Sequence, residues 1–422
     1  MATIDEAGSP RSAAIGGVIL LVGTLGATYA ISQLARNSVG VIAPNLAGEL
    51  GLSASQIGLL SSVFFFAFAA AQLPLGVALD RWGPKRCMLG CAAIVIAGTL
   101  LFAWATTPAG LIAARILMGL GTSCYLMAPL ALYAQRFAAN RFAVLAGFQL
   151  GIGTSGTLLA TAPLAFSTAA IGWRATFVVI AAVMAIAGAL IATVVRDDTP
   201  SHTAGAPRES LWRGLVGIRE AMATDSVGRL FLMNLSTYAS FVLVVGLWGG
   251  PYLTHVYGLT LTERGNLLLI PAITQIIGMM VWGPADRLFG GYKIAALLGA
   301  GATALLLVLL AVIGRPPLPV LIVGLALFGF AASYMAVVVA HGKSLFAPHL
   351  VGRGLTLLNM AAMGGAFLSQ TVSGFAIDLF PATDGVYPLA SYRLVFALQA
   401  GFVVLTCVAY ASARDPMAQK SA

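Results

Sequence analysis

The chain has 422 residues, of which 59% are hydrophobic and only 9% are charged, and its mean hydropathy is +0.94. Soluble domains carry about a quarter charged residues, so a water-soluble fold would expose too much apolar surface. The net charge of +9 comes from residues scattered among short loops, and this excludes a nucleic-acid-binding surface. The composition therefore predicts an integral membrane protein.

Apolar stretches of membrane-spanning length follow one another along the whole chain. A bilayer core of about 30 Å needs roughly 20 apolar residues per helix. By that criterion the fold is all-α, with twelve transmembrane helices. We place them at residues 14–43, 55–79, 87–105, 109–134, 142–166, 174–195, 230–253, 264–285, 294–313, 319–340, 352–379 and 392–413. The pattern Ser53-x-x-Gln56 before the second helix predicts a capping box.

The distribution of Lys and Arg predicts the orientation. With a cytoplasmic N-terminus, seventeen of the 23 Lys and Arg residues fall in cytoplasmic segments and two, Arg36 and Arg115, fall within spans. The external loops hold Arg174, Arg264, Arg315 and Arg393. This bias predicts a multi-pass protein of the cell (inner) membrane with both termini cytoplasmic.

The longest polar segment divides the spans into two sets of six. We expect an N-terminal tail at residues 1–13, a six-helix bundle at 14–195, a cytoplasmic linker at 196–229, a second six-helix bundle at 230–413, and a tail at 414–422. Within the linker, Glu209–Met222 has apolar residues at helical spacing, which predicts an amphipathic helix on the inner membrane surface. It is either a passive linker or a regulatory element.

Two short loops about half the chain apart resemble each other. GVALDRWGPKR (76–86) follows the second span and GPADRLFGGYK (283–293) follows the eighth. The second copy differs by an inserted residue and a shifted glycine. Because both loops place an Asp-Arg pair, a glycine and a lysine just beyond a span, the two halves look duplicated.

These motifs carry a family resemblance. The first loop is similar to the signature loop between helices 2 and 3 of the major facilitator superfamily. Arg115-x-x-x-Gly119-x-Gly121 resembles that family's helix 4 motif, and Gly172-Trp173-Arg174 resembles the opening of its helix 6. The resemblance implies two six-helix bundles that rock about a central site by alternating access, with helices 1, 4, 7 and 10 lining the solute path.

The signature loops predict a conformational latch. Asp80, at a helix C-terminal end, is unfavourably placed against the helix dipole unless a cation or another helix N-terminus compensates it. The residues expected to form the latch are Gly76, Asp80, Arg81, Gly83 and Lys85, with Asp286 and Arg287 from the second copy. The alternative is that the basic residues, Lys85 and Arg86 above all, only set the topology.

Arg36 and Arg115 need a partner at membrane depth. A charge at the bilayer centre costs about 3 kcal/mol by insertion scales, and none of the fourteen acidic residues lies in the middle of a span. An anion from solution is the natural counter-ion, because the planar guanidinium suits carboxylate or phosphate. RNSVGVIAP (36–44) also resembles helix 1 of organic-anion members of the superfamily. Alternatively, Arg115 holds neighbouring helices through their backbone carbonyls.

The sequence thus predicts a secondary transporter of a small organic anion. The expected solute-binding residues are Arg36, Arg115, Tyr29, Gln33, Asn37, Tyr125, Asn234, Tyr238 and Tyr334, although any of the polar ones could instead hold helices together. We expect function as a monomer in the lipid bilayer, with a coupled proton or counter-solute, and no cofactor, metal or enzymatic activity. The alternative is an efflux transporter for drugs or metabolites.

Overall fold

The structure is a computed structural model that describes residues 10–195, 211–347 and 350–417. The first half consists of α1 (Pro10–Asn37), α2 (Val39–Leu50), α3 (Ala54–Trp104), α4 (Pro108–Thr122), α5 (Cys124–Arg136), α6 (Ala139–Leu159) and α7 (Ala162–Val194). The second half begins with α8 (Leu211–Ala223), α9 (Val227–Leu243), the π-helix η1 (Val244–Trp248), α10 (Gly249–Tyr257), α11 (Leu261–Trp282) and α12 (Ala285–Leu288). It continues with α13 (Tyr292–Ile313), α14 (Leu318–Ala331), the 3₁₀ helix η2 (Ala332–Tyr334), α15 (Met335–Leu345), α16 (Val351–Asp378) and α17 (Leu389–Ala411).

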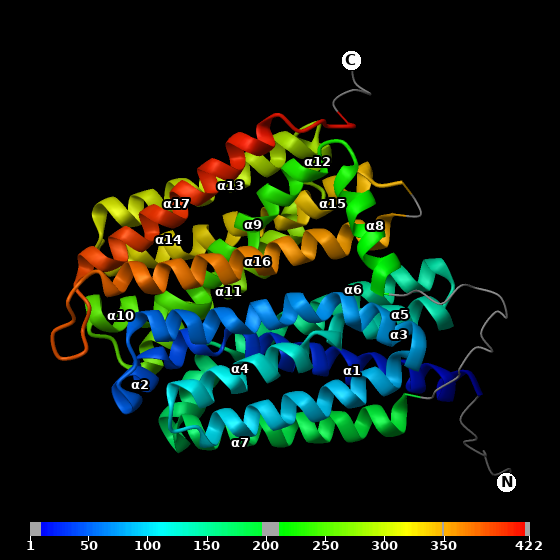
Figure 1. Ribbon diagram of the computed structural model, residues 1–422, viewed down its shortest axis with the longest axis horizontal. Coiled ribbons are helices and arrows are strands. Elements are labelled where there is room, and N and C mark those ends of the chain that lie inside the picture. The colour runs from blue at the N-terminus through cyan, green and yellow to red at the C-terminus, as the bar shows by residue number, and fades with distance from the viewer. Residues whose placement is uncertain (1–9, 196–210, 348–349, 418–422) are drawn as a thin grey trace, which may run out of the picture.

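The helices form two bundles that lie against each other. In Figure 1 the first bundle, α1 to α7, lies below the second, α9 to α17. The start of α1, the end of α17 and the connecting helix α8 are at one end of the molecule, which we call the terminal end. The opposite end, with α2 and α10, is called the far end.

Within the described residues, eleven helical segments are long and apolar enough to cross a membrane. Two of the crossings come from α3, which reverses at Gly83 because that residue adopts φ 80°, a conformation that favours glycine. A similar break at Gly172 (φ 79°) divides α7, and the apolar part of α6 (Val144–Leu159) supplies the fifth crossing. The predicted all-α membrane fold of twelve helices in two bundles is confirmed.

The structure also confirms the predicted capping box at the start of α3. The Ser53 hydroxyl accepts a hydrogen bond from Gln56 N (3.2 Å), and Gln56 Oε1 accepts one from Ser53 N (3.0 Å). Thr260 and Glu263 form the same arrangement at the start of α11. These caps fix where the two helices begin at the far end.

Two elements differ from the sequence prediction. The first span, predicted as continuous over 14–43, is broken at Ser38, and its second part extends to Leu50. The linker helix begins at Leu211, while Glu209 and the side chains of 211–215 lie outside the described residues. Ile218 and Ala221 of this helix pack against the core of the second bundle, so that face rests on protein. Its position on a membrane surface stays a prediction.

Glycines allow the closest helix contacts within each bundle. On α16, a Cβ added at Gly365 would lie 1.7 Å from the carbonyl oxygen of Leu235 on α9, whereas one added at the neighbouring Gly364 would meet nothing within 4 Å. These two adjacent positions on one helix therefore form a matched pair.

We expect Gly365→Ala to lower the melting temperature of the detergent-purified protein. The α9 backbone would have to move, and overpacking of this kind costs about 1–3 kcal/mol. Gly364→Ala is the control and should leave the melting temperature unchanged or slightly raised, because alanine favours helix. Equal melting temperatures for the two variants would contradict the packing described for α16.

Candidate functional site: an unpaired arginine between the bundles

Four crossings are interrupted near their middle. The first breaks at Ser38 and the fourth at Ser123, while the seventh contains η1 and the tenth contains η2. These are the four helices that the family resemblance expects to line the solute path. Helix breaks leave main-chain groups outside the regular hydrogen-bond pattern and often mark functional sites. The site is therefore sought at the level of these breaks.

Arg36 lies in the last turn of α1, between the two bundles. Its side chain is buried, and its guanidinium carbon lies 4.5 Å from the ring centre of Phe68 on α3 and 5.8 Å from that of Tyr238 on α9. Its Nε has no hydrogen-bond partner, and within the described part of the chain its side chain forms no hydrogen bond or ion pair. A buried cation is thus held only by two aromatic faces.

Polar side chains on the same face of α1 surround Arg36. Tyr29, Gln33 and Asn37 recur every four residues, so they share one side of the helix. Gln33 Nε2 donates to the Tyr29 hydroxyl (3.5 Å), and Asn37 Nδ2 donates to the Gln33 carbonyl (2.9 Å). Gln33 Oε1 and Asn37 Oδ1 are buried without a partner. Free acceptors therefore lie next to the free Arg36 donor.

The Asn37 side chain faces the second bundle. A Cβ added at Gly246, within η1, would lie 3.2 Å from Asn37 Oδ1. The breaks of the first and seventh helices therefore meet, and the polar face of α1 points to the boundary between the bundles. Tyr238, which faces Arg36, lies one to two turns before η1 on the same helix.

Arg115 binds backbone. Its Nε donates to the Leu60 carbonyl (3.2 Å), Nη1 to the Ala35 carbonyl (2.7 Å) and Nη2 to the Arg36 carbonyl (3.4 Å). The side chain is fully buried. The carbonyls of Ala35 and Arg36 can accept these bonds because the helix ends at Asn37, and the Ser38 hydroxyl also donates to the Ala35 carbonyl (3.0 Å). This geometry favours the alternative role of Arg115, in which it fixes the backbone that carries Arg36, over the expected solute contact.

The remaining predicted site residues lie inside their own bundles. Asn234 donates to the Leu358 carbonyl and thereby joins α9 to α16. The hydroxyl of Tyr334 lies 3.5 Å from that of Ser236, and Tyr125 is almost completely buried in the first bundle. In this conformation these three side chains are buried within their own bundles, whereas Tyr29, Gln33, Asn37 and Tyr238 gather near Arg36.

Phe68 is the site residue that sequence reasoning missed. It belongs to the aromatic run FFFAF (64–68), in which Phe64 and Phe68 lie on one face of α3 with ring centres 6.5 Å apart. Phe64 covers the Arg115 guanidinium at 4.5 Å, as Phe68 covers Arg36 at the same distance. Two phenylalanines at helical spacing opposite two membrane arginines were the available signal.

The signature loops are only partly described. Gly83 makes the turn of the first loop, and Arg81 lies 5.9 Å from the ring of Trp82, while the Asp80 side chain lies outside the described residues. In the second loop, Asp286 and Arg287 lie on the short helix α12, and Gly291 N donates to the Asp286 carbonyl (2.9 Å). The latch formed by Gly76, Asp80, Arg81, Gly83, Lys85, Asp286 and Arg287 stays a prediction.

An acid from the C-terminal segment holds the helix after the second loop. Asp415 Oδ2 accepts a hydrogen bond from Lys293 N in the first turn of α13 (2.8 Å), and its side chain is buried. A carboxylate at a helix N-terminus is favoured by the dipole. Residues 414–417 are therefore packed onto the second bundle, where the sequence suggested a tail.

The two bundles close on each other at the far end through small residues. The pairs in contact are Gly40 with Gly250, Gly58 with Gly374, and Ala165 with Gly265. Between the bundles, hydrogen bonds of the described residues gather here and join residues 41–62 to residues 264–387. Bundles this close leave no room for a solute to pass at the far end.

Asp378 fastens one of these contacts. At the end of α16, its two carboxylate oxygens accept hydrogen bonds from Ala54 N (3.0 Å) and Ser55 N (2.9 Å), at the N-terminus of α3 in the other bundle. The Tyr387 hydroxyl also donates to Asp378 (2.8 Å). Burial, and then this hydrogen bond, raise the pKa of Tyr387 above its usual value, so the hydroxyl remains a donor. The helix dipole of α3 favours the negative charge.

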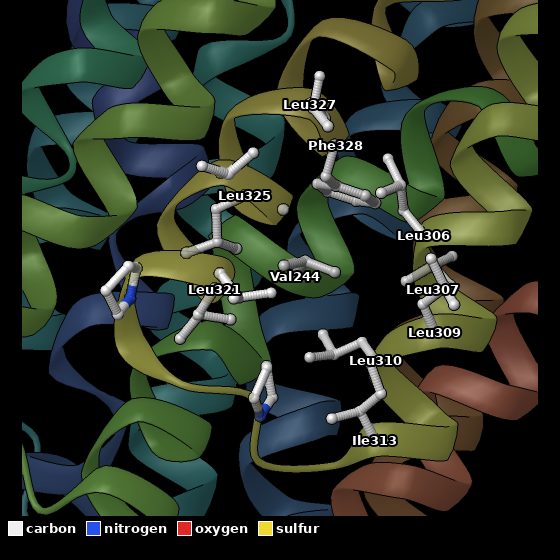
Figure 2. Close-up of a pocket in the computed structure, with 15 residues that line it drawn as sticks. Val244, Leu306, Leu307, Leu309, Leu310, Ile313, Leu321, Leu325, Leu327 and Phe328 are labelled. Atoms are coloured by element: carbon white, nitrogen blue, oxygen red, sulfur yellow. The ribbon is translucent and has the colours of Figure 1, made fainter.

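An apolar cavity of about 470 Å³ lies apart from this site, between α13 and α14. Figure 2 shows its lining, with Leu306 and Leu310 on one side, Leu321 and Leu325 on the other, and Val244 behind. Every lining residue is apolar, and the rim residue Val323 is 58% exposed. The cavity offers no partner for a charged solute, and part of its apolar lining is exposed.

Comparison with known proteins identifies relatives of this chain. A family model described as Major Facilitator Superfamily matches residues 25–245 and 230–421. The protein named "Probable sulfoacetate transporter SauU" from Cupriavidus necator is 29% identical over 285 residues, which is 64% of this chain and 65% of that protein. The chain thus aligns with slightly less than two thirds of that relative. A "Probable L-galactonate transporter" from Escherichia coli is 27% identical over 328 residues, 71% of this chain and 70% of its own.

Solved structures share the fold. A variant of the nucleoside transporter NupG superposes with a TM-score of 0.77 at 16% identity, covering 92% of this chain and 98% of that one. At this identity the similarity concerns the arrangement of the helices alone.

We expect Arg115→Met to destabilise the protein strongly. The substitution removes the hydrogen bonds that Arg115 donates to the carbonyls of Ala35, Arg36 and Leu60, and a hydrogen bond to a charged group contributes about 1.5–3 kcal/mol. The melting temperature of the purified variant should fall well below that of Arg81→Met, which removes an exposed arginine. Similar values for the two variants would show that Arg115 is not structural.

We expect Asp378→Asn to loosen the far end. An amide offers one acceptor oxygen where the carboxylate serves three donors, at a cost of about 1–2 kcal/mol. In a chain with its four cysteines replaced by serine, Ser62→Cys reports on the closed contact, because Ser62 is fully buried and bonded to Thr371 across it. A membrane-impermeant maleimide should label it about tenfold faster after the substitution.

Asp384→Asn is the control for this measurement. Asp384 is exposed on the adjoining loop and has a positive φ of 51°, which asparagine tolerates. If both variants label Ser62→Cys at the same rate, Asp378 does not hold the bundles together.

Proposed function

The chain belongs to the Major Facilitator Superfamily, and from this premise we propose that it is a secondary transporter of a small organic anion that works by alternating access. Members of this superfamily move small-molecule solutes and are not enzymes. The solute we propose carries at least one carboxylate, sulfonate or phosphate group. Its anionic group pairs with Arg36.

The observation that carries this proposal is the unpaired guanidinium of Arg36. A buried cation without a counter-ion costs about 3 kcal/mol or more at membrane depth. Within the described residues, two aromatic rings face this guanidinium and no carboxylate forms an ion pair with it. A bidentate anion would satisfy the free donors and neutralise the charge at once.

The scaffold around Arg36 supports the same proposal. Arg115 fixes the Ala35 and Arg36 carbonyls, so the Arg36 side chain starts from a rigid backbone. The free oxygens of Gln33 and Asn37 can accept from a donor on the solute, such as a hydroxyl. Relatives whose names refer to sulfoacetate and L-galactonate, both organic anions, agree with this solute class.

We also propose the orientation. The excess of Lys and Arg in the segments at the terminal end supports a cytoplasmic location for that end and for both termini of a cell-membrane protein. The far end then faces outward, and the conformation described here is closed to the outside. We also propose that the protein functions as a monomer.

The positions of the carboxylates also bear on how transport is coupled to a second solute. Among the described side chains, the carboxylates lie near the ends of the helices or in loops. A co-transported proton would therefore travel on the acid group of the solute, and the other possibility is exchange against a second anion.

The test compares Arg36 variants in ligand-dependent thermal shift. Sulfoacetate or L-galactonate should raise the melting temperature of the wild-type protein, because a ligand that binds only the folded state stabilises it. Arg36→Gln should raise the dissociation constant at least tenfold, since the lost charge-assisted contacts contribute about 1.5–3 kcal/mol. Arg36→Lys should recover little, because lysine lacks the planar fork.

Two controls separate this effect from misfolding. The melting temperature of unliganded Arg36→Gln should not fall, because the substitution breaks no hydrogen bond within the protein. Arg315→Gln removes an exposed arginine and should keep the full ligand-dependent shift. The proposal fails if Arg36→Gln binds these anions, and transports them into proteoliposomes, as well as the wild type does.

A further inference from the structure

A third arginine is buried between the bundles, at the far end. Arg264 lies one turn into α11, and only 4% of its surface is exposed, although the sequence suggested an external loop residue. Its Nε donates to the Val41 carbonyl (2.9 Å), its Nη1 to the Thr254 hydroxyl (2.9 Å), and its Nη2 to Asn45 Oδ1. Every hydrogen bond of its side chain within the described residues goes to a neutral oxygen.

Three acids at the far end have other partners, and the fourth, Asp384, is exposed and forms no described ion pair with Arg264. Glu49 binds Trp173 and Arg174, and Glu263 turns back to cap α11 through Thr260. Asp378 is held by the N-terminus of α3, as described above. Among the described residues, no carboxylate therefore forms an ion pair with Arg264.

Two of the three acceptors of Arg264 belong to the other bundle. Val41 and Asn45 are on α2, whereas Thr254 is on α10 of the same bundle as Arg264. When the bundles part at the far end, α2 moves away, and Nε and Nη2 lose their partners together. These two donors lie on the same edge of the guanidinium, the arrangement that takes a carboxylate or sulfonate in bidentate fashion.

We propose that Arg264 is an anion-capture site at the far-end mouth, which the closed state occupies with the backbone and amide oxygens of α2. In the open state it binds the acid group of an organic anion before that anion reaches Arg36. In the closed state the same guanidinium fastens α2 to α11. This inference rests on the proposed function, because it takes the solute to be an anion.

The test measures charge at the open mouth without measuring transport. The chain has its four cysteines replaced by serine and carries Leu261→Cys, which lies one turn before Arg264 on the same helix face. Gly374→Trp holds the far end open, because a side chain at Gly374 would press on Ala54, Ser55 and Gly58 of the other bundle. Arg36→Gln removes any contribution from the central site.

The probes are two thiol reagents of opposite charge, the sulfonatoethyl and the trimethylammonium-ethyl methanethiosulfonates. At low ionic strength the ratio of their labelling rates, anionic over cationic, should fall about tenfold on Arg264→Gln. This value follows from Coulomb's law for unit charges roughly 6 Å apart in water. Arg264→Lys should keep most of the ratio, and Arg315→Gln should keep all of it. A purely structural role would change both rates equally and leave the ratio unaltered.

A second measurement needs no Arg264 variant and covers the case in which Arg264→Gln does not fold. Methanesulfonate added to the opened chain should compete at Arg264 and slow the anionic reagent but not the cationic one. An unchanged ratio in Arg264→Gln, or no selective effect of methanesulfonate, overturns the inference. Either result leaves the Arg36 proposal standing, and failure of the Arg36 test leaves this measurement intact.

Discussion

The structure depends on a positive charge that the protein buries and does not neutralise. Arg36 stands between two bundles with aromatic rings on either side, and its Nε has no acceptor. Such a group is unfavourable unless a ligand completes it. Most polar side chains of the membrane helices have partners nearby, which makes this exception informative. An anion that binds to Arg36 neutralises this unfavourable buried charge, and this contributes favourably to the free energy of binding.

Arg36 and Arg115 have different roles because their surroundings differ. Arg115 donates to three carbonyls, and two of them, those of Ala35 and Arg36, are available because α1 ends at Asn37. The helix break therefore creates both the acceptors for Arg115 and the freedom of the Arg36 side chain, which leaves the helix at the point where the regular turn stops. Rigid support behind a free donor is the arrangement that binding sites need, because little order must be gained when the ligand arrives.

The sequence was sufficient to predict the fold, and it singled out Arg36 as a candidate, because both follow from composition along the chain. Span lengths come from hydropathy, and the lack of a mid-membrane acid can be counted from the residues. The breaks at Ser38 and in η1 could not be predicted, since tertiary contacts decide where a helix stops. The burial of Arg264 was equally hidden, because α2 of the other bundle provides it. Loop position in the sequence says nothing of what packs against the loop.

The contacts that close the far end also bear on transport. Glycines bring the bundles within backbone contact at Gly40 and Gly58, so the closed state depends on surfaces without side chains. Such contacts are strong only when fully made, because dispersion forces decline steeply with a small gap. The hydrogen bonds that Asp378 and Arg264 form between the bundles are likewise made or lost together. A closure built this way has two stable positions rather than a continuum, which is the property that alternating access requires.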